Sequence, residues 1–276
     1  MIEAAHRISV GCSEAVGLCR TGAELDEVLG SGRLALVLAL EGCPQVDTDV
    51  ELLETLARLG VRMVSLAHFG RSALADGSGE DATNSRLTRA GVEAVELLES
   101  MGVLLDISHL GRSGVQHVLD LSTRPVIATH SSARALHDHH RNLDDAQIKG
   151  VAAGGGVVCV NFVPGFLGAG EATVDSIVDH LEHVVIVAGI DAVGLGPDFE
   201  QEILQEKVSV CDRPLIVEGI DVFRSVPGVN GPAGLPLVTE CMLRRGWPVP
   251  DIRKVLGENV RRLLTAELGR PASSSE

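Results

Sequence analysis

The chain has 276 residues, of which 45% are hydrophobic and 22% charged, enough to build one large buried core. Its net charge of −15 argues against binding to nucleic acid and to anionic membrane surfaces. The sequence has neither a basic-plus-apolar leader nor a run of 18 apolar residues, which predicts a cytoplasmic protein. The six cysteines show no CxxC spacing and are expected to be reduced thiols.

In chain order, a mildly apolar, helical start over residues 1–20 is followed by short apolar runs that alternate with amphipathic segments. Continuous apolar runs predict strands buried on both faces, as in parallel sheets. The predicted strands cover residues 34–40, 61–67, 103–107, 125–129, 156–161 and 192–196. Apolar residues spaced three and four apart predict helices, the main ones at residues 24–29, 49–59, 87–98, 111–121, 173–188, 236–245 and 251–265. Residues 201–234 are expected to form an irregular excursion, and residues 271–276 a disordered tail.

Repeated strand–helix units with a polar residue at each strand end favour an α/β barrel of the TIM type over a doubly wound sheet. A barrel of this type has eight strands, so six are recognised and two are not. We expect residues 1–270 to form a single barrel domain. Thr21 and Glu24 match a capping box, which predicts a helix that begins beside them.

The stretch from residue 103 to residue 130 is a strand–helix–strand unit in which each strand leads to a histidine. His109 follows the first strand, and His130 follows the second. Such a crossover predicts that the two strands are parallel and adjacent, with both histidines at the carboxyl edge of the sheet. Two imidazoles about a strand spacing apart suit a shared metal ion, whereas a lone histidine there would more often cap a strand.

Several short stretches, in this order and spacing, resemble the membrane dipeptidase family, the M19 zinc dipeptidases of the amidohydrolase barrel type. They include LEG at 40–42, LAH at 66–68, GVLLDISH at 102–109, PVIATHSS at 125–132, RN at 141–142, VNF at 160–162, GLGPDF at 194–199 and GENVRR at 257–262. The resemblance extends from about residue 23 to residue 264. It implies a zinc-dependent dipeptidase that hydrolyses the peptide bond of dipeptides with a metal-activated hydroxide.

For the metal site, the resemblance implies that Glu41 bridges two zinc ions and that His109 and His130 complete the protein ligands of one of them. The family's other zinc ion is held by a His-x-Asp pair on an early strand. Here the early histidine is His6, which lies in a helical segment without an aspartate two residues later. The two unrecognised strands are therefore expected to be the first two, and the chain is expected to bind one zinc ion. A homodimer is implied by the resemblance alone.

Four further residues are implied to act on the substrate. Asp198 would carry a proton to the departing amine, and His68 would donate to the carbonyl oxygen where charge develops. Arg141, followed by Asn142, would hold the terminal carboxylate of the dipeptide. Structural alternatives are a polar strand cap for His68, a solvated loop side chain for Arg141 and a backbone cap for Asp198. Three loop histidines nearby are left out of the metal site: His137, His139 and His140.

Three functions stay open on these grounds. The first is a zinc dipeptidase of this family that acts on small dipeptides. The second is a catalytically impaired barrel that binds a dipeptide-like ligand or a partner without turnover, which the unmatched His-x-Asp pair favours. The third is a related amidohydrolase that acts on a lactone or another amide. The first is favoured by six matching residues: Glu41, His68, His109, His130, Arg141 and Asp198.

Overall fold

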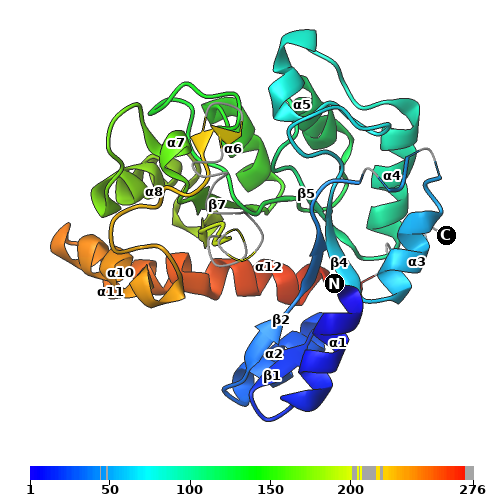
Figure 1. Cartoon of the computed structure of the whole chain (residues 1–276), viewed down its shortest axis with the longest axis horizontal. Helices are drawn as coiled ribbons and strands as arrows, with labels where there is room; N and C mark the ends of the chain where they lie inside the picture. The colour runs from blue at the N-terminus through cyan, green and yellow to red at the C-terminus, as the bar shows by residue number, and fades with distance from the viewer. Residues whose placement is uncertain are drawn as a thin grey trace. The chain divides into compact units, whose positions relative to one another are not determined.

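The computed structural model describes residues 1–43, 45–47, 49–200, 204, 206, 216–217 and 220–270, and Figure 1 traces the chain. These residues form two compact units. The first unit comprises Met1–Ile127, Gly154–Gly156 and Val260–Glu276, and the second comprises Ala128–Ala153 and Val157–Asn259. The predicted tail at 271–276 and much of the predicted excursion at 201–234 lie outside the described residues.

The first unit begins with two helices that the sequence predicted. α1 (Ile2–Gly11) forms the helical start. α2 (Gly22–Gly30) begins at the predicted capping box, in which the hydroxyl of Thr21 accepts the N–H of Glu24 and the carboxylate of Glu24 accepts the N–H of Thr21. These reciprocal bonds satisfy donors that the first turn of a helix otherwise leaves open.

The apolar run at residues 34–40 forms two strands, so the prediction of one buried strand is wrong. β2 (Leu34–Leu36) pairs in parallel with β1 (Val16–Leu18), and the two lie beside α1 and α2 in Figure 1. β3 (Leu38–Leu40) instead pairs in parallel with β4 (Val61–Ser65). Neither half of the run is fully buried. The run divides because its two halves join different sheets.

The main sheet of the first unit has parallel strands in the order β3, β4, β5 and β6. β5 (Leu104–Asp106) pairs with β4 over three residues, and β6 (Ile127–Ala128) pairs with β5 through Asp106 and Ile127. The prediction that β5 and β6 are parallel neighbours is therefore confirmed. The connecting helices are α3 (Leu52–Arg58), α4 (Arg89–Ser100) and α5 (Arg112–Leu121), with the 3-10 helix η1 (Ser78–Thr83) before α4. Because parallel strands end at the same edge, the residues that follow them are brought together.

The second unit is built around β7 (Val157–Asn161), whose five residues are all buried and which pairs in parallel with β8 (Val193–Gly196). α8 (Val174–Ala188) begins at a capping box formed by Thr173 and Ser176 and follows the predicted limits closely. The remaining elements of this unit are α6 (Asp145–Ala153), α7 (Pro164–Leu167), η2 (Ile190–Ala192), β9 (Ile216–Val217), β10 (Ile220–Asp221), η4 (Pro232–Gly234), α10 (Leu235–Arg244), α11 (Val249–Arg253) and η5 (Lys254–Glu258).

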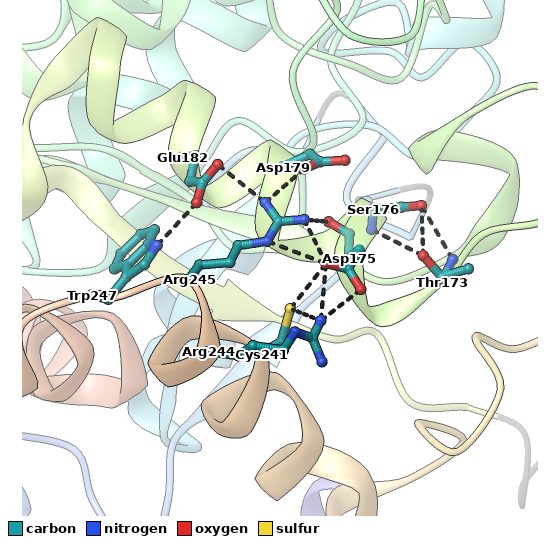
Figure 2. A network of polar contacts seen from close by, with 9 residues as sticks. All are labelled: Thr173, Asp175, Ser176, Asp179, Glu182, Cys241, Arg244, Arg245 and Trp247. Carbon is teal, nitrogen blue, oxygen red and sulfur yellow. Dashed lines mark hydrogen bonds and ion pairs between the residues drawn. The ribbon is translucent and has the colours of Figure 1, made fainter.

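A network of charged side chains joins α8 to the end of α10 (Figure 2). Arg245, directly after α10, donates to the carboxylates of Asp175 at 2.8 Å, Asp179 at 2.7 Å and Glu182 at 3.1 Å. The hydrogen bond from Arg245 is the main reason that the pKa of Asp175 falls to about 2. One guanidinium therefore fixes three successive turns of α8.

The last predicted helix, at residues 251–265, is interrupted. A π-helical turn, η5, separates α11 from α12 (Asn259–Glu267), and Gly257 within it has a φ of +158°. Glycine can adopt a positive φ of this kind because it has no Cβ. The spacing of the apolar residues alone does not reveal this interruption. Among the described residues, no helix combines the length and the apolarity needed to cross a bilayer.

Candidate metal centre

Three of the predicted site residues meet in the first unit. Glu41 follows β3, His68 lies shortly after β4, and His109 lies shortly after β5, so all three come from the carboxyl ends of neighbouring parallel strands. Their ligand atoms all lie within 4.8 Å of one another. Within the described part of the chain, this is the one group of His, Cys, Asp and Glu side chains close enough to share a metal ion.

The two histidines both approach the same carboxylate oxygen of Glu41. His109 Nε2 lies 2.8 Å from Glu41 Oε1, and His68 Nε2 lies 3.8 Å from the same atom. The two imidazole rings stack with their centroids 4.1 Å apart, and Phe69 presents its ring at right angles to both. His109 is 4% exposed, whereas Glu41 and His68 are about half exposed. One candidate ligand, His109, is therefore buried, whereas Glu41 and His68 are open to solvent.

Local hydrogen bonds hold the turn after β3. The N–H of Gly42 donates to Ser65 Oγ at 2.7 Å, and Cys43 Sγ donates to the carbonyl oxygen of Ser65 at 3.1 Å. Gly42 has a φ of +73°, and a Cβ at this position would lie 3.4 Å from both Cβ and N of His68. Glycine is favoured here because the chain turns into the left-handed region directly beside a candidate ligand.

His109 is held in an uncommon backbone conformation. Its φ is +71°, in the left-handed region that costs a non-glycine residue about 1 kcal/mol or more. The turn before it is fixed by Asp106, whose Oδ1 accepts the N–H of Ser108 at 2.9 Å. Asp106 and Ser108 are buried, as is His109 itself. Strain of this kind persists where surrounding contacts impose it, which is common at functional sites.

His130 and Arg141 belong to the second unit. His130 is buried, with Nδ1 2.7 Å from the hydroxyl oxygen of Thr129. Arg141 is 3% exposed rather than solvated, and its guanidinium donates to Ser131 Oγ at 2.9 Å and to the carbonyl oxygen of His130 at 2.8 Å. The predicted carboxylate-binding arginine therefore supports the main chain of a predicted metal ligand.

The remaining predicted residues also lie in the second unit. Asn142 is buried, and its Nδ2 donates to the carbonyl oxygens of His137 and Phe166, each at 2.9 Å. Asp198 has a φ of +59° and accepts a hydrogen bond from Asn161 Nδ2 at 3.1 Å. The sequence did not single out Asn161 as a partner of Asp198, although it lies in the matching VNF stretch at the end of β7.

The three loop histidines left out of the metal site do form a cluster. The rings of His139 and His140 lie 4.2 Å apart, and those of His137 and His139 lie 6.1 Å apart. Burial, followed by the neighbouring His140 and His137, lowers the pKa of His139 to about 4. His139 Nδ1 accepts the N–H of Arg141 at 3.1 Å, so this imidazole takes part in holding the loop.

The donor set at the candidate centre fits a zinc ion. One carboxylate oxygen and two imidazole nitrogens are ligand types of zinc, and catalytic zinc commonly has three protein ligands and one open position. The exposure of Glu41 and His68 leaves room for that open position. The sequence predicted Glu41, His109 and His130 as ligands of one ion, and the structure places His68 within reach of the same point.

Comparison with known proteins identifies the family. Residues 1–213 match the sequence model of the membrane dipeptidase family (peptidase family M19). Dipeptidase verJ from Clonostachys rogersoniana is 30% identical over 264 residues, which cover 95% of this chain and 63% of that protein. The chain thus spans about six-tenths of the length of the first curated relatives it matches, 63% and 58%.

Two solved structures share the fold. One is a metallopeptidase from Rhodobacter sphaeroides liganded with a phosphinate mimic of the dipeptide L-Ala-D-Ala; it is 28% identical with a TM-score of 0.79, covering 92% of this chain and 69% of that one. The other is an amidohydrolase from Pseudomonas aeruginosa, 26% identical with a TM-score of 0.83, covering 98% and 84%. These relatives are of the TIM-barrel type, which confirms the predicted fold class. The chain belongs to the membrane dipeptidase family, peptidase family M19.

Proposed function

We propose that this chain is a zinc-dependent dipeptidase that hydrolyses the peptide bond of small dipeptides. The observation that carries the proposal is the convergence of Glu41, His68 and His109 at the ends of adjacent parallel strands in a chain of the M19 family. Carboxylate oxygens and imidazole nitrogens are ligand types of zinc.

Glu41 and His109 would hold the zinc ion, and we propose His130 as a further ligand. A bound zinc ion would lower the pKa of a water molecule enough to make it a nucleophile near neutral pH, and would polarise the peptide carbonyl. The buried His109 supplies a nitrogen whose position is set by the protein. The half-exposed Glu41 carboxylate supplies charge that offsets that of a divalent cation.

The other residues would act on the substrate. His68, half exposed at the edge of the centre, would donate from its ring nitrogen to the carbonyl oxygen as negative charge develops there. Asp198 would take up a proton and pass it to the departing amine, with its carboxylate oriented by the amide of Asn161. These two roles require one donor and one proton carrier, and both residue types meet the requirement.

Arg141 would bind the terminal carboxylate of the dipeptide. Its two terminal nitrogens now donate to a hydroxyl and a carbonyl oxygen, both neutral acceptors. A carboxylate would offer stronger, charge-assisted hydrogen bonds to the same fork. Asn142 would support this role by tying the loop to the carbonyl oxygens of His137 and Phe166.

We propose dipeptides with small side chains as the substrate class, because the relative from Rhodobacter sphaeroides carries a mimic of L-Ala-D-Ala. The test measures alanine release from L-Ala-D-Ala by the purified chain, first stripped of metal and then reloaded with zinc. Addition of zinc should restore hydrolysis by the wild-type chain. Glu54→Gln, which changes an exposed ion pair on α3, is the matched control for Glu41→Gln and should behave as wild type.

Hydrolysis by the metal-free chain at the zinc-loaded rate would contradict the proposal. A second function, hydrolysis of another amide or a lactone, is favoured by the amidohydrolase from Pseudomonas aeruginosa, of which the chain covers 84%. The same assay should therefore include an N-acyl amino acid and a simple lactone. Faster turnover of either than of any dipeptide would favour this second function.

A further inference from the structure

A polar loop at residues 70–84 contacts the main chain at His109 and at Gly111, two residues later. The N–H of Ser78 donates to the carbonyl oxygen of His109 at 2.6 Å, and the N–H of Gly111 donates to the carbonyl oxygen of Asp76 at 3.1 Å. The backbone of His109 is therefore held from the loop as well as from its own strand. These contacts help to impose its positive φ.

Asp76 fixes the shape of this loop. Its carboxylate accepts two hydrogen bonds from Arg71, from Nε to Oδ1 at 2.6 Å and from Nη2 to Oδ2 at 2.9 Å, and a third from the hydroxyl of Thr83 at 2.7 Å. Asp76 is 8% exposed, and the hydrogen bond from Arg71 is the main reason that its pKa falls to about 2. The carboxylate is therefore ionised at neutral pH and tied to both ends of the loop.

The same loop lies against the residues that carry the other candidate ligand. A Cβ on Gly77 would lie 1.9 Å from the carbonyl oxygen of His68 and 2.4 Å from that of Phe69. The N–H of Gly79 donates to the carbonyl oxygen of Phe69 at 2.9 Å. A displacement of residues 76–79 would consequently disturb the backbone at both histidines of the centre.

We propose that Asp76, held by Arg71, is a positioning residue of the metal centre that places His109 Nε2 against Glu41. It acts through the main-chain hydrogen bonds of residues 76–78 and is not itself a ligand. The inference rests on the proposed function, in which Glu41 and His109 bind zinc. Partners that orient metal ligands typically change metal affinity by about 10–100-fold when they are mutated.

The test titrates the metal-free chain with Co²⁺, whose visible absorption reports the ligand geometry. Asp76→Asn keeps the size of the side chain and removes its charge, and Arg71→Gln removes the fork. Each should weaken binding about 10-fold or more and alter the absorption bands at saturating Co²⁺, whereas Arg71→Lys should recover part of the loss. The double variant should be no worse than Asp76→Asn, because the two residues act as one unit.

The control is Glu93→Gln, which removes a similar charge from the exposed Arg89–Glu93 pair on α4. It should match wild type in affinity and in absorption. Asp76 would not be a positioning residue if the variants bound Co²⁺ less tightly but kept the wild-type absorption bands at saturating Co²⁺. That result would mean that the centre is destabilised but correctly arranged, and it would overturn the positioning role. Additive losses in the double variant would overturn the link to Arg71.

A metal-free measurement separates this inference from the proposed function. The ¹⁵N resonances of the His109 ring report its contact with Glu41, and amide hydrogen exchange at Ser78 and Gly111 reports the two main-chain bonds. Asp76→Asn should shift the ring resonances and speed the exchange at both amides. Wild-type chain that binds no Co²⁺ would overturn the metal centre, while unchanged resonances and exchange rates in the variant would overturn the role of Asp76.

Discussion

Glu41→Gln tests the metal centre with a minimal change of shape. Glu41 Oε1 lies 2.8 Å from His109 Nε2 and 3.8 Å from His68 Nε2, so it is the atom at which the candidate ligands meet. The substitution replaces a carboxylate by a neutral amide of nearly the same size. It therefore removes the charge of a candidate ligand while leaving the turn after β3 in place.

The magnitude follows from the number of ligands. Structural zinc sites with four protein ligands bind with about 10–16 kcal/mol, which is roughly 3 kcal/mol for each ligand. Loss of one ligand should weaken zinc binding by about 100-fold. Because Glu41 is 48% exposed, the free energy of unfolding of the metal-free chain should change by less than about 0.5 kcal/mol.

The assay is competition for zinc with a chromophoric chelator, combined with thermal unfolding with and without zinc. A ligand at 100 times its dissociation constant stabilises the folded state by about 2.7 kcal/mol, so zinc should raise the Tm of wild type much more than that of the variant. Zinc affinity within about threefold of wild type would refute the assignment of Glu41 as a ligand.

Four further predictions concern single residues. His130→Ala should weaken zinc binding at least as much as His68→Ala, and the reverse order, measured by chelator competition, would assign the ligand role to His68. Arg141→Lys should raise the KM for a dipeptide more than for its C-terminal amide; equal increases would show that Arg141 does not bind the carboxylate. Arg245→Ala should lower the free energy of unfolding in urea by about 1–3 kcal/mol, since exposed pairs each contribute up to about 1 kcal/mol and Arg245 makes three; a loss under about 0.5 kcal/mol would contradict this. The pKa of Asp76 is lowered to about 2, so its contribution to stability is present above pH ~4 and lost as pH falls toward 2; unfolding of Asp76→Asn should be less acid-sensitive in that window, and parallel acid profiles would disagree.

The parts of the fold that the sequence predicts well have a local cause. α8 is strongly periodic from a capping threonine to Gly189, and the capping box at Thr21 and Glu24 is made by residues three positions apart. The errors arise where the structure of a segment depends on pairing with a strand that is distant in the sequence. The run at 34–40 divides because its halves pair with different strands, and a three-residue strand such as β1 is too short to show a period.

The candidate site divides in the same way. Residues that follow apolar strands could be predicted as site residues, because parallel strands bring their carboxyl ends to one edge, and Glu41, His68 and His109 do meet. The roles of Asp76 and Asn161 could not be predicted, because they depend on hydrogen bonds to residues that the fold brings near. The burial of Arg141 was likewise set by tertiary packing, since its place in a polar loop indicates exposure.

Anomalous diffraction at the zinc absorption edge, from crystals of the zinc-loaded chain, tests the proposed metal centre directly. We expect a peak between the carboxylate of Glu41 and Nε2 of His109, at about 2.0–2.2 Å from each of these atoms. The peak should disappear in Glu41→Gln crystals grown in the same way. A peak elsewhere, with no scatterer between Glu41 and His109, would contradict the proposed metal centre.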